Sequence, residues 1–265
     1  MSPKPLSAER CLEAARACVD VAGATDRGEV RARNEDSYGV FEDLGLYLVA
    51  DGVAGRAHGD VASRMAVDLI HRYVDRVRPT WPTEAHDERD PAAELLAAAV
   101  RYANRRIYRD GLADGEGRGM TTTFVGVLVE GDKVCLAHVG DSRAYRLRRG
   151  HLEQLTVDHS LGNEMAQGRR PGDWLLAHVN PAALTRAVGL FESVDVTLRL
   201  DRAEPGDILL LCSDGLTNMI DSADIAGILG AVRDLEVSAR ALIATAKAAG
   251  GLDNITVVLV RWDER

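Results

Sequence analysis

The sequence predicts a single-domain α+β protein whose sheets are antiparallel. From Met120 to Thr156, short β-prone runs follow one another, separated by tight turns such as Gly131-Asp132 and Arg149-Gly150. Connections this short fit hairpins, whereas a parallel βαβ unit needs a much longer crossover. β-prone runs also occur near both chain ends. We therefore expect the first and last strands to pair and residues 1–265 to form one domain.

The composition is that of an ordinary globular protein, with 46% hydrophobic and 28% charged residues. The net charge of −9 argues against a general nucleic-acid binder, which needs a basic surface to contact phosphates. No apolar run approaches the roughly 20 residues that span a bilayer. Residues 1–10 also lack the apolar core of a secretion signal. We therefore expect a cytoplasmic protein that does not contact a membrane.

The four cysteines indicate buried, reduced thiols rather than disulfides or a zinc site. Cys11, Cys18, Cys135 and Cys212 form no C-x-x-C pair and lie in apolar context. Cys11 and Cys18 are seven residues apart, which would place both on one face of a helix. These two cysteines belong to an N-terminal extension, residues 1–18, that precedes the domain proper.

The first part of the domain alternates strands and turns before a helix. β-branched and aromatic residues predict strands at 19–26, 37–43 and 45–51. A helix is expected at 59–77, with Asp60 near its N-terminus. Its apolar stripe recurs at helical spacing through Val61, Met65, Leu69, and Tyr73 or Ile70.

A loop with three prolines, residues 78–91, leads to a second predicted helix at 92–111. Its apolar stripe contains Leu96, Val100 or Ala99, Ala103 and Ile107, and Gly111 is expected to end it. The glycine-rich stretch 111–119 lacks the Gly-Lys-Ser/Thr ending of a phosphate-binding loop. We therefore expect a flexible loop there.

After the hairpins, residues 157–192 show little periodicity. Strands are predicted again at 194–200 and 207–214, two helical segments occupy about 222–249, and a strand at 254–262 closes the chain.

Acidic residues stand at the ends of very apolar strands. These residues are Asp51, Asp141, Asp214, Asp253, and the pair Glu35 and Asp36. Singly, each is explained as a turn residue, because Asp hydrogen-bonds its own backbone in turns. If the strand ends converge, repulsion between the carboxylates would cost on the order of several kcal/mol. A bound cation would remove that cost.

The available ligands select a hard metal ion. Carboxylate and backbone oxygens suit Mg²⁺ or Mn²⁺, whereas zinc would want more histidine or cysteine. Two-metal carboxylate sites usually serve phosphoryl chemistry. Arg31 and Arg33 are each explained as solvated residues, but beside a metal site one becomes a candidate phosphate ligand. The residues alone thus indicate a metal-dependent phosphoester hydrolase.

Eight ordered motifs extend this interpretation. They are TDRGEVRARNEDS, VADGVAG, GMTTTFVGVLV, AHVGDSRAYRLRRG, LTVDHSL, LTRAVG, LLLCSDGLTNMI and DNITVVLV. Together they resemble the motifs of the metal-dependent protein serine/threonine phosphatases of type 2C, in their bacterial single-domain form, from about Val19 to Trp262. The resemblance implies a four-layer αββα sandwich, with two central antiparallel sheets flanked by helices and a metal cleft at one end.

The resemblance also implies a role for each acidic residue. Asp51 would bridge two Mn²⁺ or Mg²⁺ ions, the carbonyl of Gly52 would bind one of them, and Asp214 and Asp253 would complete the other's shell. Glu35 and Asp36 would hold metal-bound waters. Asp141, with Asp214, would bind a third, weaker ion.

Arg31 matches the family's phosphate-binding arginine and Arg33 a variable position. The implied reaction is direct attack on phosphoserine or phosphothreonine by a water bridging two ions. Ser142 and Cys212 are then structural residues rather than nucleophiles.

Three departures from the family pattern stand out. Val53, Ala54 and Arg56 provide no acid to protonate the leaving group. Asn218 stands where some relatives have Asp, which weakens the third metal site. Residues 162–184 differ most from the usual flap beside the active site, a variable segment at about 157–190.

Two alternatives to a protein phosphatase remain open from the sequence. One is a catalytically weak module of the same fold that regulates a signalling partner, although such a module is expected to lose ligands and this chain keeps them. The other is hydrolysis of a small phosphoester or of phosphoarginine. The expected partners are phosphorylated proteins, among them a cognate Ser/Thr kinase or its targets, and the chain is expected to be monomeric.

Overall fold

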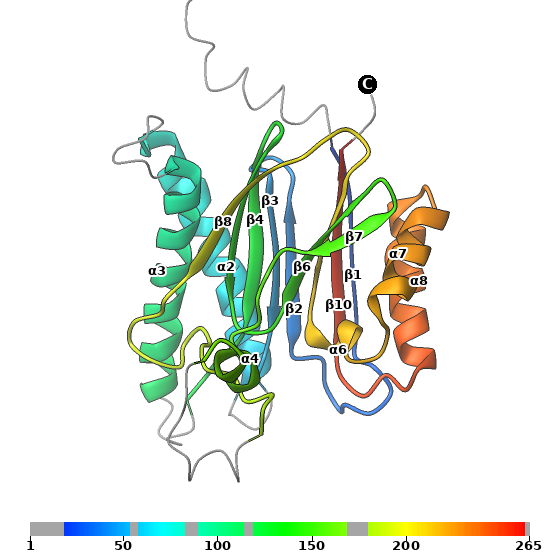
Figure 1. Cartoon of the computed structure of the whole chain (residues 1–265). Helices are drawn as coiled ribbons and strands as arrows, with labels where there is room; N and C mark the ends of the chain where they lie inside the picture. The colour runs from blue at the N-terminus through cyan, green and yellow to red at the C-terminus, as the bar shows by residue number, and fades with distance from the viewer. Residues whose placement is uncertain (1–18, 54–57, 83–89, 114–118, 169–179, 263–265) are drawn as a thin grey trace, which may run out of the picture.

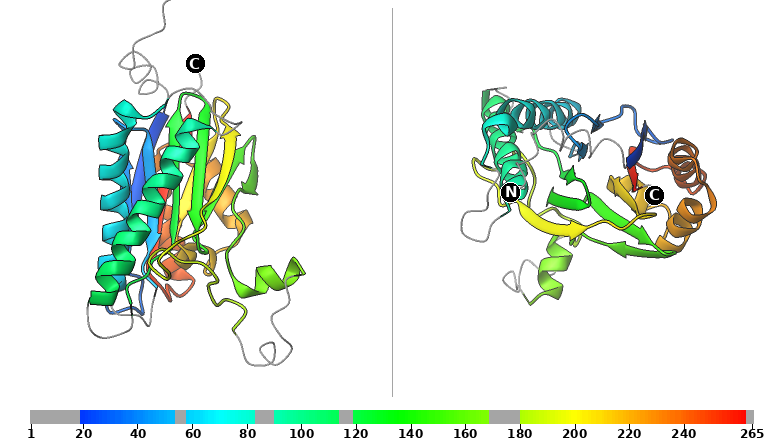
Figure 2. Two further views of the ribbon diagram at one scale, coloured as in Figure 1. Left: turned by 90° about the vertical axis from the view of Figure 1, so that its left-hand side faces the viewer. Right: turned by 90° about the horizontal axis from the view of Figure 1, so that it is seen from above.

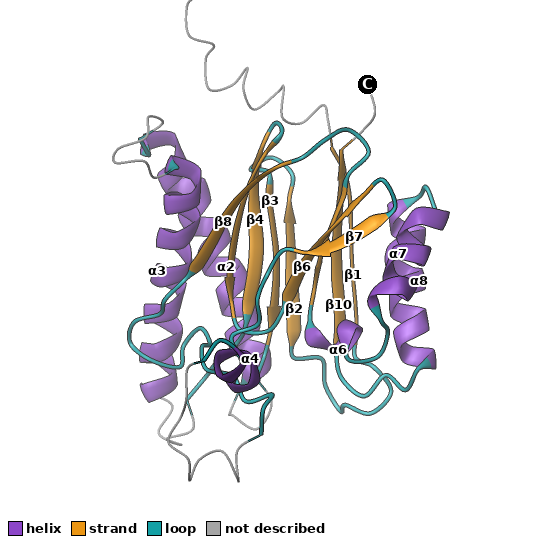
Figure 3. Cartoon of the chain, in the orientation of Figure 1, coloured by secondary structure: helices purple, strands orange, loops and turns teal. Residues whose placement is uncertain are grey.

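The computed structural model describes residues 19–53, 58–82, 90–113, 119–168 and 180–262. Figure 3 shows the helices and strands in these ranges. The strands are β1 (Val19–Asp26), β2 (Asp36–Phe41), β3 (Leu46–Asp51), β4 (Phe124–Glu130), β5 (Lys133–Val139), β6 (Arg143–Arg148), β7 (His151–Gln154), β8 (Thr197–Arg202), β9 (Ile208–Cys212) and β10 (Ile255–Trp262). The helices are α2 (Gly59–Val77), α3 (Pro91–Ala113), α4 (Leu161–Ala166), α6 (Asp214–Thr217), α7 (Ser222–Ala231) and α8 (Leu235–Ala248), with a 3₁₀ turn at Arg78–Thr80.

The strands form two five-stranded antiparallel sheets stacked face to face. One sheet has the order β1-β10-β9-β6-β7 and the other β2-β3-β4-β5-β8. Helices α2 and α3 cover the outer face of the second sheet, and α7 and α8 cover the first (Figures 1 and 2). The predicted αββα sandwich is therefore confirmed. The first and last strands pair along their whole length, from Val19 opposite Trp262 to Asp26 opposite Ile255.

The predicted run of hairpins at 120–156 does not stay in one sheet. The β4–β5 hairpin belongs to the second sheet, where β5 pairs with β8, and the β6–β7 hairpin belongs to the first, where β6 pairs with β9. The chain changes sheets at Gly140, whose φ of 105° is a conformation that side-chain-bearing residues rarely adopt. Local turn spacing therefore predicted the hairpins but not their separation into two sheets.

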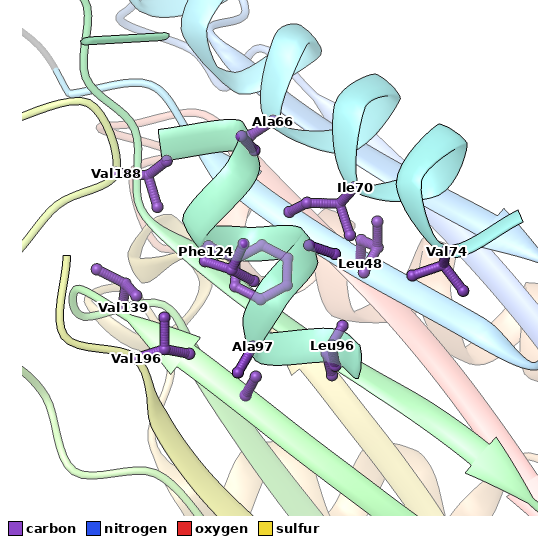
Figure 4. Packing of buried hydrophobic residues seen from close by; sticks show 14 of the residues in the cluster. Leu48, Ala66, Ile70, Val74, Leu96, Ala97, Phe124, Val139, Val188 and Val196 are labelled. Atoms are coloured by element: carbon purple, nitrogen blue, oxygen red, sulfur yellow. The ribbon is translucent and has the colours of Figure 1, made fainter. Parts of the chain in front are cut away.

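Three apolar layers hold the sandwich together. The middle layer lies between the sheets and includes Tyr47, Val127 and Leu211. The layer under α2 and α3 packs Leu48 and Phe124 against Ile70 (Figure 4), and a third layer lies under α7 and α8. Because central strands such as β3 are buried on both faces, they read as continuous apolar runs rather than alternating ones.

Helix α2 spans the predicted residues, but its buried face is shifted by one position. Ala62, Ala66, Ile70 and Val74 are fully buried, so the predicted alternative Ile70 is confirmed, whereas Val61, Met65, Leu69 and Tyr73 pack half-buried beside them. The small alanines make the face that packs closely against the sheet.

Helix α3 buries the predicted stripe of Leu96, Val100, Ala103 and Ile107. The prediction that Gly111 ends this helix is wrong, because the helix continues to Ala113. A Cβ at Gly111 would lie 2.7 Å from the backbone nitrogen of Met120. The glycine therefore does not end the helix. Its lack of a side chain lets the backbone at Met120 pack closely against it.

Cys135 and Cys212 are buried free thiols, as predicted, whereas Cys11 and Cys18 lie outside the described residues. None of the helices in the described ranges has both the length and the apolar character needed to cross a bilayer.

Candidate active site

The acidic strand ends meet at one end of the sandwich, the lower end in Figure 1 near α6. Asp36 and Asp51 are register partners in the β2–β3 pair. Asp214 begins α6 two residues after the end of β9, and Asp253 lies two residues before β10. Antiparallel pairing thus brings together acids that are up to 217 positions apart in the sequence.

A cleft of about 610 Å³ opens at this end. Its charged lining residues are Arg31, Arg33, Glu35, Asp51, Asp141, Asp214 and Asp253, and its other lining residues include Gly52, Val53, Thr121, Thr123 and Asn254. The predicted site residues other than Asp36 therefore line one cleft.

The backbone of Asp51 is fixed by the two threonines directly before β4. Its N–H donates to Oγ1 of Thr123 (3.1 Å), and its carbonyl accepts from the Thr123 N–H (2.7 Å) and the Thr122 hydroxyl (2.8 Å). Sequence reasoning did not assign these threonines a role in the site. The Thr121-Thr122-Thr123 run directly before an apolar strand was the available signal.

Gly52 sits where no side chain would fit. Its N–H donates to the carbonyl of Glu35 (3.1 Å), and a Cβ on Gly52 would lie 2.5 Å from the backbone of Gly59 and 2.7 Å from the Glu35 carbonyl oxygen. The carboxylate of Glu35 in turn lies against Gly59, the first residue of α2. A negative charge at the start of a helix is favourable.

Asp36 lies beneath the cleft rather than in its lining, and it is only 8% exposed. Its Oδ2 accepts hydrogen bonds from Ser213 Oγ (2.8 Å) and Thr256 Oγ1 (2.7 Å). Its Oδ1 has no hydrogen-bond partner among the described residues. Ser213 and Thr256, on the other sheet, are supporting residues that sequence reasoning missed.

Burial and crowding raise the pKa values of the central carboxyl groups. The pKa of Asp51 is raised well above its usual value by burial and then by Asp36, Asp214 and Asp141. Burial, followed by the charge of Asp214, raises the pKa of Asp141 to about 7. Burial also raises the pKa of Asp36 and, together with Asp253, that of Asp214. Ionising all of these groups at neutral pH therefore costs free energy that a cation can offset.

Arg31 brings a positive charge to the same cleft. Its Nη2 lies 2.6 Å from Oδ2 of Asp253, and this hydrogen bond raises the pKa of the guanidinium. Arg33 lines the cleft as well. The structure thus brings both candidate phosphate ligands to the carboxylates.

Asn254 organises the segment that carries Arg31. Its amide nitrogen donates to the carbonyls of Arg27 and Arg33 (2.9 Å each), and its Oδ1 accepts from the N–H of Glu35 (2.7 Å). Asn254 belongs to the motif DNITVVLV, but the sequence alone does not indicate a role for its side chain. These three backbone groups lie in the loop between β1 and β2, which pairs with no strand, so the Asn254 side chain supplies their hydrogen bonds.

The site has the donor chemistry of a hard-cation site. Within the described ranges, no three His, Cys, Asp or Glu side chains are already arranged to hold a metal ion, and one candidate ligand, Asp253, is paired with Arg31. Carboxylate and carbonyl oxygens nevertheless converge on one cleft, their pKa values are raised, and a buried Asp36 oxygen has no partner. These features fit divalent ions such as Mn²⁺ or Mg²⁺.

Neither Ser142 nor Cys212 is placed to act as a nucleophile. Ser142 is buried, with its Oγ 2.6 Å from Oγ1 of Thr123. Cys212 is fully buried, and burial raises its pKa to about 12. Both therefore have the structural roles that were expected.

The three departures from the family pattern are only partly covered by the structure. Val53 lines the cleft and donates its N–H to the carbonyl of Thr121 (3.0 Å), whereas Ala54, Arg56 and residues 169–179 of the flap lie outside the described residues. Asn218 donates from Nδ2 to Oδ2 of Asp214 (3.0 Å).

Comparison with known proteins gives evidence about the family of this chain that does not depend on the geometry of the site. The family model described as protein phosphatase 2C matches residues 27–247. The serine/threonine phosphatase stp of Listeria monocytogenes is 38% identical over 243 residues, which cover 90% of this chain and 94% of that protein.

Comparison with solved structures also finds serine/threonine phosphatases similar to this chain. The serine/threonine phosphatase PstP/Ppp of Mycobacterium tuberculosis superposes with a TM-score of 0.78 at 33% identity, covering 93% of this chain and 100% of the other. A structure of the PstP catalytic domain in complex with two manganese ions has a TM-score of 0.76 at 33% identity, covering 93% and 99% of the two chains.

Proposed function

The chain belongs to the protein phosphatase 2C family, and from this premise we propose that the acidic end of its sandwich is the catalytic centre. The chain is a metal-dependent protein serine/threonine phosphatase that uses Mn²⁺ or Mg²⁺. Asp51, Asp214, Asp253 and the Gly52 carbonyl would hold two ions. The observation that carries this assignment is the convergence of these carboxylates, from both sheets, on one cleft.

Bound divalent ions supply a hydroxide at neutral pH and offset the negative charge of a phosphoryl group. The protein's own contribution is positioning. Thr122 and Thr123 fix the backbone of Asp51, and Ser213 and Thr256 fix the carboxylate of Asp36 from below. Glu35 and Asp36 would orient water at the site. Such prior ordering means that no reorganisation is needed when the substrate reacts.

Arg31 would bind the phosphoryl group of the substrate. Its ion pair with Asp253 engages Nη2, and the side chain is 40% exposed. A guanidinium offers five N–H donors in a flat fork, so the remaining donors can hold phosphoryl oxygens while Asp253 fixes the orientation.

Asp141 and Asp214 are the candidates for a third, weaker ion. Asn218 contributes a neutral amide beside them rather than another carboxylate. Fewer negative ligands mean weaker binding of a divalent ion. Two ions should therefore suffice for turnover.

The direct test is hydrolysis of p-nitrophenyl phosphate and of a phosphothreonine peptide, with manganese and with chelator. We expect turnover of both that requires the metal. An absence of manganese-dependent turnover in either assay would overturn the proposed function. None of the comparisons supports the alternative of a regulatory module. A panel containing phosphoarginine and small phosphoesters would show whether the cleft prefers another phosphorylated group.

The chain acts on phosphorylated proteins, and we place it in the cytoplasm, as a monomer that opposes a Ser/Thr kinase. The buried free thiols of Cys135 and Cys212 suit a reducing compartment. A phosphoproteome after deletion of the gene would identify the substrates, and sedimentation would give the oligomeric state.

A further inference from the structure

One segment gives the cleft an apolar side. Five residues between positions 180 and 192 line the cleft, and all five carry alkyl side chains: Ala182, Ala183, Leu184, Ala187 and Leu190. We refer to these five residues as the apolar wall. Every charged residue that lines the cleft comes from another part of the chain.

The polar residues of this segment are directed elsewhere. Arg186 lies between Leu184 and Ala187, but its Nη1 is 3.5 Å from a carboxylate oxygen of Asp195 and 3.4 Å from Oγ1 of Thr197. Neither Arg186 nor Thr185 lines the cleft. The alkyl character of the wall is thus a property of how the segment is folded, and not only of its composition.

The N-terminal part of the apolar wall is held by the segment around α4. The N–H of Leu161 donates to the carbonyl of Ala183 (2.9 Å), and the N–H of Thr185 donates to the carbonyl of His159 (2.8 Å). Leu184 is bridged to Ser160 by these bonds.

The C-terminal part of the wall is held to the catalytic centre and to α3. Val188 and Thr122 exchange two backbone hydrogen bonds (2.8 and 3.0 Å), and Thr122 is in turn bridged to Gly52. The buried side chain of Asn104 accepts from the Gly189 N–H (2.7 Å) and donates to the carbonyl of Phe191 (3.0 Å). The wall is therefore built into the structure at a fixed position relative to Gly52.

We propose that the apolar wall receives an uncharged, apolar side chain that lies next to the phosphorylated residue of a protein substrate. Consecutive Cα atoms are about 3.8 Å apart, so when a phosphorylated residue is bound at the carboxylates its neighbour is still inside the cleft. An alkyl side chain there gains contact with the wall. A charged side chain loses water and finds no partner in the wall, so it is disfavoured.

This inference rests on the proposed function and specifies its substrate class. The test uses phosphothreonine peptides that differ only in the residue directly after the phosphothreonine, which is Leu, Ala, Glu or Lys, and a second set varies the residue directly before it. With manganese present, we expect kcat/KM to be about tenfold higher for Leu than for Glu or Lys in one of the two sets. Equal kcat/KM values in both sets would overturn the inference.

Variants of Leu184 connect any preference to the apolar wall. In Leu184→Glu the ratio of kcat/KM between the Leu and Lys peptides should fall towards one or reverse, and in Leu184→Ala it should fall by a smaller factor. The matched control is Leu200→Glu, because Leu200 is 53% exposed on β8 and does not line the cleft. It should keep the wild-type ratio. A Leu184→Ala ratio equal to that of the wild type would assign the preference to another surface.

The ratio is measured within one protein sample, so partial unfolding of a variant does not alter it. Loss of all manganese-dependent turnover in the wild type would count against the proposed function. Full turnover without a preference at either neighbouring residue would count only against the apolar wall.

Discussion

Arg31 and Asp253 form an ion pair in the lining of the cleft, with Nη2 of Arg31 2.6 Å from Oδ2 of Asp253, although 222 positions separate them in the sequence. The pair joins a candidate phosphate ligand to a candidate metal ligand. The geometry of the phosphoryl site therefore depends on both residues.

Replacing Arg31 should weaken substrate binding and transition-state stabilisation together. We expect Arg31→Ala to lower kcat/KM for a phosphothreonine peptide by about 10- to 100-fold, because a charge-assisted bidentate contact is lost. Arg31→Lys should recover only part of this, since an ammonium lacks the planar fork. Steady-state kinetics give both values. Arg33→Ala is the comparison, and a larger effect there than at Arg31 would assign the phosphate contact to Arg33.

Replacing Asp51 should remove metal binding without unfolding the protein. We expect Asp51→Asn to lower manganese-dependent turnover by at least about 100-fold. The metal-free variant should be at least as stable as the wild type, because a buried carboxyl with a raised pKa is replaced by a neutral amide. Manganese should raise the melting temperature of the wild type but not of the variant.

Scanning calorimetry with and without manganese checks this prediction. Asp68→Asn is the control, because Asp68 is exposed on α2 and lies outside the cleft. A manganese-dependent shift of equal size in Asp51→Asn and in the wild type would show that the ions bind elsewhere.

Asn254 should act as a positioning residue. Asn254→Ala removes three hydrogen bonds to backbone groups, and we expect it to lower the free energy of unfolding by about 2–3 kcal/mol. Because Asn254 orders the segment of Arg31, KM should rise more than kcat falls. Asn254→Asp has the same shape but cannot donate to the carbonyls of Arg27 and Arg33, so it should be no better than Asn254→Ala. Full activity in Asn254→Asp would contradict this role.

His159 should make stability depend on pH. Its ring is buried and stacked on His138, with centroids 4.5 Å apart, and Arg186 is close by. Burial, and then the charges of His138 and Arg186, lower the pKa of His159 to about 3. In the unfolded chain a histidine titrates near pH 6.5, so between these values the unfolded state binds the extra proton. The stability contributed by the neutral ring is therefore complete above pH 6.5 and is lost as the pH falls towards 3.

Below pH 6.5, we expect His159 to lower the free energy of unfolding by about 1.4 kcal/mol for each pH unit. Urea unfolding between pH 4 and 8 measures this effect. The free energy of unfolding should depend less steeply on pH in His159→Gln than in the wild type. His151→Gln is the control, because His151 is exposed on β7. Identical pH profiles for His159→Gln and the wild type would contradict the prediction.

The sequence predicted the elements well because their signals are local. Helix α2 begins and ends at the predicted residues, and each predicted strand corresponds to a strand of the structure within a few residues. The errors arose where tertiary contacts decide. Gly111 was expected to end α3. The structure shows instead that the backbone of Met120 lies so close to Gly111 that a side chain would not fit there. The buried face of α2 was displaced by one position because alanine carries little hydrophobic signal although it packs closely.

By itself, the sequence determined which carboxylates end apolar strands, and the family resemblance supplied a role for each. Tertiary structure alone decided how these groups are placed: Asp36 lies beneath the cleft while the others line it, and Arg31 pairs with Asp253. It also decided which residues support them, including Thr122 and Asn254, and which residues form the apolar wall. The physical reason is that periodicity and turn chemistry act over a few residues. A cleft, its dielectric environment and its shifted pKa values arise only when strands distant in the sequence are brought together.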